Sequence, residues 1–323
     1  MRLRYASDVR TLLWTFVLTP ALAALLYARP ALVPYLSWVS CYFALACGVI
    51  AHNHNHCPTF ESKRANSIFA GWISIFYGYP TFAWIPTHNL NHHKFVNKAG
   101  DATITWRFTN KNNALVGITY FFVSSYYQSG PIKEFIRKAK AGNPKLYRQI
   151  VTQYVVWAGA HLGLFALALA IHGPKTGLYV YVFAFALPAF FALWTIMFFN
   201  YGQHVHTDPW SKHNHSRTFN GRLLNFLLFN NGLHTVHHEH ASAHWSTMRE
   251  IHEKIAPEIH PELNLRSFWW WVIRSFFLAP IFPSMGTKQI GRAPFDTESP
   301  RTAAVETATI GEAVQAGINA PMV

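Results

Sequence analysis

The sequence predicts an all-α integral membrane protein with four transmembrane helices in two hairpins, interfacial helices and a histidine-rich cap on the cytoplasmic side. Composition is the first observation behind this prediction. Of the 323 residues, 51% are hydrophobic and only 13% are charged, whereas soluble domains carry about 25% charged residues. The second observation is a set of long apolar segments, and the third is a set of histidine clusters that adjoin them.

Four segments have the apolarity and roughly the length, about 20 residues, that a bilayer span requires. They are Thr11–Tyr27, Ala31–Ala51, Gln149–Ile171 and Leu178–Phe199. The connections Ala28–Pro30 and His172–Gly177 are very short, so we expect two helical hairpins. The first segment follows a basic start, as a signal peptide would, but the second span begins almost at once. We therefore expect a retained helix.

The positive charges indicate which side of the membrane the connections occupy. Of 27 Lys and Arg residues, the two short turns hold only Arg29 and Lys175. The other 25 lie in the first ten residues, between the hairpins, or after residue 200. The positive-inside rule makes this the cytoplasmic face. It also explains the net charge of +13 better than nucleic-acid binding does, because we find no basic helix or aromatic–basic RNA motif.

Three further apolar segments are expected not to cross the bilayer. If Ser67–Pro86 crossed, a hydrocarbon layer of roughly 30 Å would separate histidines that need to meet, so we expect it to dip into the membrane or lie along it. The same expectation holds for Ala114–Tyr127. Phe268–Phe282 is aromatic, short and interrupted by a charge, which is typical of an interfacial helix. We assign residues 1–283 to one membrane domain and expect residues 284–323 to be a mostly disordered tail.

Nine histidines dominate the polar part of the chain. They form the clusters HNHNH, HNLNHH and HTVHH, with one more histidine ahead of the third cluster. Spacings of three, four and one place side chains on one face of a helix. By the predicted topology, every cluster also arrives on one side of the membrane. The nine are His52, His56, His88, His92, His93, His204, His234, His237 and His238.

Histidine is the commonest side-chain metal ligand, and nine imidazoles are too many for one ion but enough for two. A structural zinc site would favour cysteine, which is scarce here. An all-nitrogen site with open positions suits iron that must bind dioxygen. Carboxylates near the clusters are few, so the glutamate-rich soluble di-iron bundles are not the pattern. The candidates are Glu61, Asp101, Asp208 and Glu239.

The order H-x3-H, H-x3-HH, H-x2-HH resembles the membrane fatty acid desaturase and hydroxylase superfamily, the histidine-box di-iron enzymes. The resemblance runs from about Ala31 to Trp245 and includes the four-span plan and the gaps between the boxes. It implies two iron ions on the cytoplasmic side of the membrane, with the nine histidines as ligands. Asn200, four residues before His204, matches an asparagine that in some acyl desaturases contacts one metal through water.

Two departures from the family pattern matter. The first box is HNHNH rather than a histidine followed by an acidic residue, so His54 is an alternative ligand. On a helix His54 would point away from His52 and His56, and it therefore ranks second. The third box begins with His234, where front-end desaturases carry glutamine, and no fused cytochrome b5 domain is visible. The histidine at position 234 and the lack of a visible cytochrome b5 domain both disfavour a front-end desaturase.

The resemblance implies an enzyme that uses O2 as co-substrate and two electrons to introduce a cis double bond into a fatty acyl chain. The substrate is carried as an acyl lipid or an acyl thioester. The electrons come from a separate ferredoxin-, rubredoxin- or cytochrome b5-like donor, because the sequence has no flavin or ferredoxin motif. Hydroxylation of an acyl chain, alkane or carotenoid, or ketolation of a carotenoid, is the alternative. A metal transporter or haem carrier fits worse, since only His161 lies deep in a span.

Other polar residues near the clusters receive plainer interpretations. Asp101 and Asn97 follow the second box and could orient its imidazoles. His161 is expected to hydrogen-bond a neighbouring helix. Cys57 adjoins His56, and a thiolate ligand there is the less favoured interpretation. Supporting or surface roles are expected for His206, His213, His215, His240 and His244.

Overall fold

The computed structural model describes residues 2–296, which form a mostly helical protein. These residues divide into two compact units. The first unit comprises residues 2–84 and 139–196, and the second comprises residues 85–138 and 197–296. Two helices, α6 (Ala114–Gly142) and α8 (Leu187–His204), begin in one unit and end in the other.

The predicted spans are confirmed as long apolar helices. Within residues 2–296, the stretches Asp8–Ala28, Pro30–His56 and Pro144–His204 are long and apolar enough to cross a membrane. In the first unit these stretches are built from regular helices joined by short 3-10 and π turns, marked η. Its elements are α1 (Asp8–Leu12), η1 (Leu13–Leu18), α2 (Thr19–Ala28), η2 (Pro30–Leu32), α3 (Val33–His56), α4 (Lys63–Tyr77), η3 (Thr81–Ala83), α7 (Pro144–Tyr181) and η5 (Val182–Ala186).

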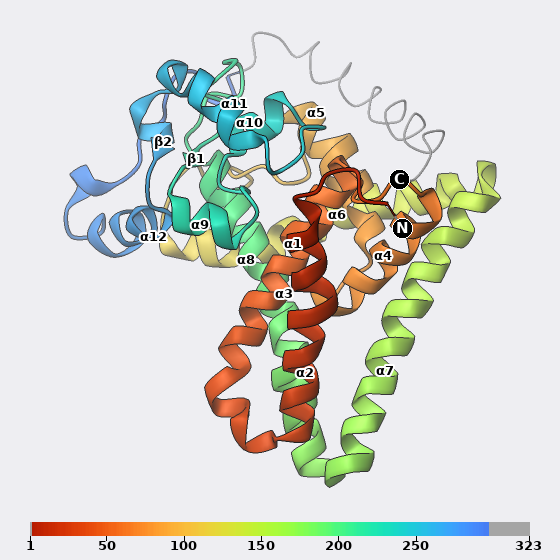
Figure 1. Ribbon diagram of the computed structural model, residues 1–323. Helices are drawn as coiled ribbons and strands as arrows, with labels where there is room; N and C mark the ends of the chain where they lie inside the picture. The colour runs from red at the N-terminus through yellow and green to blue at the C-terminus, as the bar shows by residue number, and fades with distance from the viewer. Residues whose placement is uncertain (1, 297–323) are drawn as a thin grey trace. The chain divides into compact units, whose positions relative to one another are not determined.

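The first hairpin is formed by α2 and α3, which turn at Arg29 (Figure 1). Before α2, the π-helical turn η1 interrupts the regular backbone, and side chains supply donors to its carbonyls. Thr19 Oγ1 donates to the Trp14 carbonyl at 2.6 Å, and Trp72 Nε1 donates to the Thr15 carbonyl at 2.9 Å. Such local donors matter in a span because lipid offers the backbone no hydrogen-bonding partner.

The stretch Pro144–His204 forms the second hairpin. Its 61 residues would extend about 90 Å as one straight helix, three times the hydrocarbon thickness. The helix breaks at Gly173, whose φ of 74° lies in the left-handed region that glycine tolerates. Past the break the chain doubles back, and a Cβ on Gly177 would lie 2.5 Å from the carbonyl oxygen of Ala168. The stretch therefore supplies two spans, and the four-span plan is confirmed.

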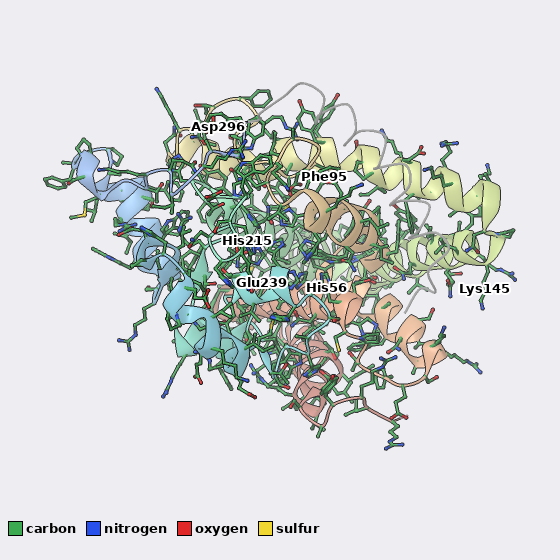
Figure 2. The ribbon with its side chains drawn as sticks, turned by 90° about the horizontal axis from the view of Figure 1, so that it is seen from above. His56, Phe95, Lys145, His215, Glu239 and Asp296 are labelled. Atoms are coloured by element: carbon green, nitrogen blue, oxygen red, sulfur yellow. The ribbon has the colours of Figure 1, made fainter. Side chains whose placement is uncertain are left out.

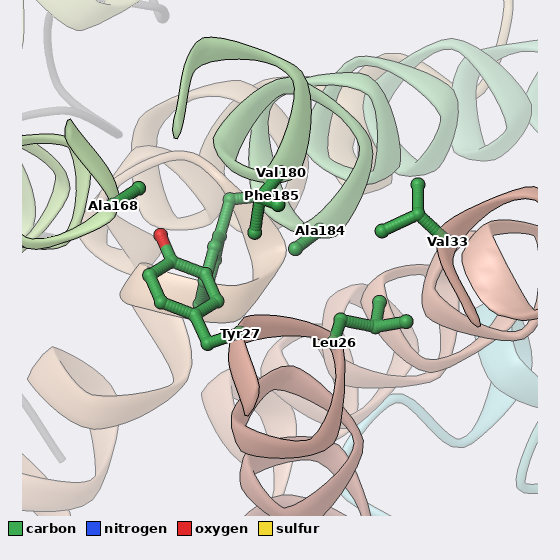
Figure 3. Close-up of a cluster of buried hydrophobic side chains, with 7 residues drawn as sticks. All are labelled: Leu26, Tyr27, Val33, Ala168, Val180, Ala184 and Phe185. Carbon is green, nitrogen blue, oxygen red and sulfur yellow. The ribbon is translucent and has the colours of Figure 1, made fainter. Parts of the chain in front are cut away.

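Both short turns lie at the same end of the first unit, as the topology requires. Tyr27, near the end of α2, donates from its hydroxyl to the Leu164 carbonyl at 3.0 Å. Its own carbonyl accepts from His172 Nε2 at 2.7 Å. These polar contacts border a cluster of buried side chains from both hairpins (Figure 3). The cluster consists of Leu26, Tyr27, Val33, Ala168, Val180, Ala184 and Phe185.

The apolar segment Ser67–Pro86 does not form a straight crossing. Helix α4 ends at Gly78, a residue with a φ of 91°, and Lys63–Tyr77 is bent by 98° from the following helical stretch Thr81–Phe95. His161, deep in α7, donates from Nε2 to the Ile75 carbonyl near the end of α4 at 3.0 Å. This contact confirms the helix-bridging role expected for His161.

The second unit carries the remaining helices and a short parallel pair of strands. Its elements are η4 (Ile85–His92), α5 (His93–Phe95), β1 (Thr218–Phe219), α9 (Arg222–Leu227), α10 (His234–Glu239), α11 (Met248–Ile255), η6 (Ala256–Glu258), η7 (Pro261–Leu263), β2 (Asn264–Leu265), α12 (Phe268–Val272), η8 (Ile273–Leu278) and η9 (Pro283–Met285). β1 pairs with β2 in the register Thr218↔Asn264 and Phe219↔Leu265. Helix α9 begins three residues after the end of β1, and α12 begins three residues after the end of β2, so the strand pairing brings the starts of these helices near each other.

The segment expected to be interfacial, Phe268–Phe282, forms α12 and η8. Phe268 stacks on Phe199 of α8 with ring centroids 4.0 Å apart, so one face packs against the end of a span. The opposite face leaves large apolar side chains exposed, among them Trp269 at 68% and Phe277 at 67%. The first half of α6, which contains Ala114–Tyr127, is not among the candidate spans of the described chain.

The tail expected from residue 284 is described only as far as Asp296. In this part Gln289 Nε2 donates to the Thr207 carbonyl at 2.7 Å, and the Ile290 amide donates to the His206 carbonyl at 3.1 Å. Residues 286–296 are thus tied to the loop that follows α8. Residues 297–323, on which most of the tail prediction falls, lie outside the described residues.

Candidate metal centre

The second histidine box lies on a π-helical turn rather than on a regular helix. η4 contains His88 and His92, and His93 follows directly. A π turn closes its hydrogen bonds from residue i to i+5, so side chains five positions apart come together. Accordingly, Nε2 of His93 lies 3.1 Å from Nε2 of His88.

Four histidines of the second unit bring their Nε2 atoms to one point. We call His92, His204, His234 and His238 group A; one ring nitrogen from each lies within 4.8 Å of the others. His92 comes from η4, His204 from the end of α8, and the other two from α10. The Nε2 atom of His204 is 3.1 Å from that of His92, 2.8 Å from that of His234 and 3.2 Å from that of His238.

Three more histidines of the second unit form group B: His88, His93 and His237. Their Nε2 atoms are separated by 3.0 Å (His88 and His237), 3.1 Å (His88 and His93) and 2.8 Å (His93 and His237). The two groups are neighbours, since the rings of His93 and His238 lie 4.5 Å apart. The adjacent histidines His92 and His93 belong to different groups, and so do His237 and His238.

The protonation of group A shows that the nitrogens present fit a metal ion. Nδ1 of His92 faces Asp101 Oδ2 at 2.7 Å, and Nδ1 of His204 faces the His215 carbonyl at 3.3 Å. Because both acceptors are oxygen atoms, the proton of each neutral imidazole lies on Nδ1, and Nε2 presents its lone pair. Two lone pairs that face each other at 3.1 Å repel, and a cation between them turns the repulsion into ligation.

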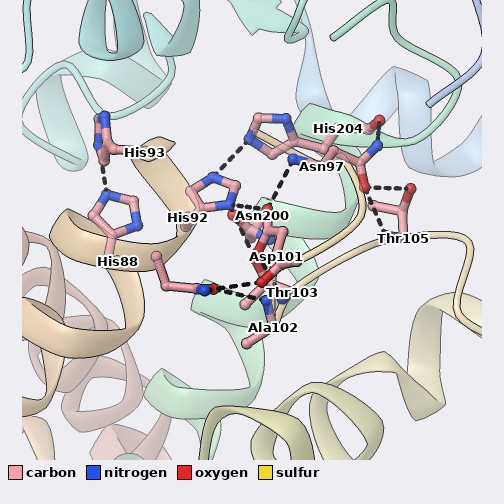
Figure 4. A network of polar contacts seen from close by, with 12 residues as sticks. His88, His92, His93, Asn97, Asp101, Ala102, Thr103, Thr105, Asn200 and His204 are labelled. Carbon is pink, nitrogen blue, oxygen red and sulfur yellow. Dashed lines mark hydrogen bonds and ion pairs between the residues drawn. The ribbon is translucent and has the colours of Figure 1, made fainter. Parts of the chain in front are cut away.

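Asp101 anchors the second box through a buried hydrogen-bond network (Figure 4). Its Oδ2 accepts the Asn97 amide at 2.8 Å, and its Oδ1 accepts the Thr103 amide and hydroxyl, both at 2.7 Å. Burial opposes the charge, but the neighbouring His92 and the donated hydrogen bonds outweigh it and hold the pKa of Asp101 below its ordinary value. An ionised Asp101 keeps the Nδ1 proton on His92 and leaves Nε2 free to bind metal.

Asn97 ties the loop after the second box to α8. Its backbone has a left-handed φ of 64°, and its Nδ2 donates to the His204 carbonyl at 3.0 Å. Its Oδ1 accepts from the Thr105 amide at 2.8 Å. The orienting role expected for Asp101 is confirmed by its contact with the His92 ring, whereas Asn97 bonds to the backbone of His204 and not to an imidazole.

Asn200 belongs to the same network. Its Nδ2 donates to the Tyr120 hydroxyl at 2.9 Å, and that hydroxyl donates to the Thr103 carbonyl. Thr103 Oγ1 in turn lies 3.0 Å from His92 Nδ1. Asn200 is therefore two residues removed from a group A imidazole, and its contact with metal through water stays a prediction.

The first histidine box lies in the first unit, at the end of α3. The rings of His52 and His56 pack edge to face with centroids 5.0 Å apart. His54 points elsewhere: its Nδ1 lies 3.0 Å from the Thr59 hydroxyl, and its ring packs against Phe69. The second rank given to His54 agrees with this contact.

The other residues considered as ligands take part in other contacts. Glu239, labelled in Figure 2, lies 2.8 Å from His213 Nδ1. His206 Nε2 donates to the Asn110 carbonyl at 2.6 Å. Nδ1 of His244 is 2.8 Å from the Ser246 hydroxyl, and His240 is exposed. Burial raises the pKa of the Cys57 thiol, which disfavours the thiolate that a metal would bind.

Sequence reasoning missed Tyr120 and Arg217. Tyr120 lies in a segment whose apolarity hid its polar role. Arg217 is buried, and its Nη1 donates to the carbonyls of Gly202 and Val205 at the end of α8, beside His204. Burial lowers the pKa of Arg217 to about 9. No signal in the sequence distinguished it from the exposed cations of the same region.

Comparison with known proteins agrees with this geometry. A protein-family profile described as "Fatty acid desaturase" matches residues 27–271, which include α3, the second hairpin and all three histidine boxes. Searches of curated proteins and of solved structures gave no match. The chain therefore belongs to the fatty acid desaturase family of O2-dependent oxidoreductases, which act on fatty acyl substrates.

Proposed function

We propose that this multi-pass membrane protein introduces a cis double bond into a fatty acyl chain, using O2 and two electrons. The observation that carries the proposal is the pair of adjacent imidazole groups in the second unit. Seven Nε2 atoms converge in two neighbouring sets, with separations of 2.8 to 3.2 Å. Two neighbouring ions could each supply one of the two electrons that the reaction with O2 requires.

Iron is the metal that we propose for both positions, because neutral nitrogen ligands with open positions suit it. His92, His204, His234 and His238 would hold one ion, and His88, His93 and His237 the other. His52 and His56, close together at the end of α3, are the two further ligands that the resemblance to the family implies. When bound, the iron ions would supply the activation of O2 and the removal of hydrogen from an unactivated methylene.

The chain's own residues fix the ligands and control their protonation. The Asp101 carboxylate holds the proton of His92 on Nδ1, and the His215 carbonyl does the same for His204. Both imidazoles are buried, at 1% and 0% exposure, so bulk water has little access to their ring nitrogens. Asn200, which donates to the Tyr120 hydroxyl, would contact one ion through a water, as the resemblance to the family implies.

The membrane topology supports a site on the cytoplasmic side, where a separate electron-donor protein could reach it. The 25 cations outside the short turns favour a cytoplasmic position for the ends of α3 and α8, and hence for the histidines, by the positive-inside rule. A separate ferredoxin-, rubredoxin- or cytochrome b5-like protein would supply the electrons. The acyl chain would enter from the bilayer or from a thioester carrier.

The test is a lipid profile, by mass spectrometry, of cells that express the protein, the His237→Ala variant or the His240→Ala variant. We expect a new unsaturated acyl species with the wild type, its loss in His237→Ala, and its retention in His240→Ala, because His240 is exposed and outside both groups. A hydroxylated product in place of the alkene would reassign the reaction. Identical profiles for all three would refute action on bulk acyl lipid.

A further inference from the structure

Each imidazole that binds metal through Nε2 keeps a proton on Nδ1, and that proton needs an acceptor. Such acceptors orient the ring and set its affinity for metal. His92 has the Asp101 carboxylate, and His204 has the His215 carbonyl. Nδ1 of His238 is different: it is buried and has no hydrogen-bond partner among residues 2–296.

The neighbouring His215 has the opposite need. Its ring is 7% exposed, and its Nδ1 lies 2.8 Å from the Lys212 carbonyl. Since a carbonyl can only accept, the proton of neutral His215 lies on Nδ1 and its Nε2 presents a lone pair. This Nε2 is also buried without a partner in the described chain. A buried donor and a buried acceptor, each alone, are both unfavourable.

The two rings lie next to each other. The ring centroids of His215 and His238 are 5.3 Å apart, and the ring planes meet at 81°. No direct hydrogen bond joins Nδ1 of His238 to Nε2 of His215, since both atoms lack a partner within bonding distance. A single buried water that accepts from one and donates to the other satisfies both atoms.

We propose that His215 is a positioning residue for the metal ligand His238, whose Nδ1–H it accepts through one buried water. The inference rests on the proposed function, because it takes His238 to be a ligand of group A. His215 then orients two ligands at once: its carbonyl accepts from His204, and its ring fixes His238.

The backbone around His215 is held firmly enough for this role. Thr207 Oγ1 shares its one proton between the His215 carbonyl at 3.0 Å and the His204 carbonyl at 2.9 Å. Two residues farther on, Arg217 donates through its backbone amide to the Gln203 carbonyl at 2.6 Å. The loop that carries His215 is therefore fastened to the end of α8, where His204 lies.

The test measures binding of Co2+ to the purified protein in detergent, with chelator competition for affinity and the visible absorption of Co2+ for geometry. His215→Phe removes the acceptor and should weaken Co2+ binding about 10- to 100-fold. His215→Gln keeps an acceptor oxygen and should restore binding to near the wild-type value. His206→Phe is the control, because His206 is buried in the same loop but bonds to Asn110 and Thr287.

A structural role alone would lower the melting temperature of His215→Phe and of the control without a selective change in Co2+ binding or absorption. Unchanged Co2+ affinity in His215→Phe would overturn the inference, as would equal losses in His215→Phe and His215→Gln. X-ray absorption showing one nitrogen ligand fewer in His215→Phe would also overturn it, since His215 would then bind metal itself. If His215→Phe does not fold, His215→Leu makes the same comparison.

The failure of this inference is distinguishable from the failure of the proposed function. A wild-type protein that binds no Co2+ would contradict the metal centre itself. A wild-type protein that binds Co2+ together with a His215→Phe variant that binds it equally well would contradict only the role of His215.

Discussion

The Asp101 carboxylate orients the proposed metal ligand His92 but is not itself one of the proposed ligands. Its oxygens accept from the Asn97 amide, from Thr103 and from His92 Nδ1, so it fixes the loop and the imidazole together. Asp101→Asn places an amide nitrogen where only acceptors fit. We expect metal affinity to fall about 10- to 100-fold, because outer hydrogen bonds to ligands have effects of that size.

Chelator competition on the purified protein measures the effect of Asp101→Asn. Asp208→Asn is the matched control, since Asp208 lies in the loop after α8 and accepts from the Trp210 amide rather than from a histidine. Asp208→Asn should leave metal affinity unchanged. Equal affinities for the Asp101 and Asp208 variants would contradict the orienting role.

Arg217 is a buried cation that contacts no carboxylate among the described residues. Burial disfavours its charge, but it donates to the carbonyls of Gly202 and Val205, and its guanidinium lies 5.4 Å from the Trp271 ring centroid. Arg217→Leu relieves the buried charge but removes the guanidinium donor from three carbonyls, those of Gly202, Val205 and Glu262. Each unsatisfied carbonyl costs about 1–3 kcal/mol, so we expect a net loss of about 3 kcal/mol.

Thermal denaturation in detergent measures the effect of Arg217→Leu, with Arg222→Leu as the control on the exposed side of α9. The control should melt within about 2 °C of the wild type, since exposed substitutions change stability little. A melting temperature for Arg217→Leu at or above the wild-type value would show that relief of the buried charge wins.

At the scale of elements, the hairpin turn of α7 depends on close approach at Gly177. A Cβ there would lie 2.5 Å from the Ala168 carbonyl oxygen, an atom that cannot move aside without moving the backbone. We expect Gly177→Val to separate the two arms of the hairpin and to lower the melting temperature by several degrees. The disturbed contact also borders the Tyr27 cluster, so both hairpins should loosen together.

Gly163→Ala is the control for Gly177→Val. Gly163 lies in the same helix, yet nothing lies within 4 Å of the position of its Cβ. Alanine is a better helix former than glycine by about 1 kcal/mol, so this variant should be as stable as the wild type or slightly more stable. A melting temperature for Gly177→Val equal to that of the wild type would disprove the close packing at the turn.

The sequence predicted the spans well because hydropathy and span length are coupled directly to the bilayer. The predicted segment Ala31–Ala51 lies within the helical stretch Pro30–His56, and the predicted turn His172–Gly177 contains the break at Gly173. The bend after α4 was also predictable, because the histidines could not otherwise face one side. In each case a single physical constraint decided the outcome.

The parts that the sequence did not predict depend on tertiary contacts. A π-helical turn at the second box has no hydropathy signature, yet it is what joins His93 to His88. The short strands β1 and β2 pair over only two residues each, too few to show alternation. The split of each His-His pair between two groups depends on how α10 meets η4, which spacing alone leaves open.

At the scale of the whole molecule, the exposed apolar side chains and the charge distribution both indicate a protein embedded in a membrane. The large exposed side chains include Tyr35 and Trp38 on α3, Leu162 on α7, and Trp269 and Phe277 on α12 and η8. On a soluble protein such exposure would promote aggregation, whereas in a bilayer it is the solvated state. The interfacial placement of α12 and η8 stays a prediction, supported by their packing on the end of α8.

The last prediction concerns which side of the membrane the short turns face. In a variant that lacks Cys41, Cys47 and Cys57, a cysteine at Lys175 or at Lys254 reports the side of its segment. Lys175 lies just after the break at Gly173, and Lys254 lies on α11 with its side chain 69% exposed. Both positions are outside the histidine groups.

The charge distribution predicts opposite sides for these two cysteines. A membrane-impermeant maleimide should label Lys175→Cys in intact cells and should label Lys254→Cys only after permeabilisation. The hydrogen bond from His172 to the Tyr27 carbonyl ties the two turns together, so a cysteine at Arg29 should behave like the one at Lys175. Labelling of Lys254→Cys in intact cells would place α11, and with it the histidines of the second unit, outside the cytoplasm and would remove an intracellular electron donor from consideration.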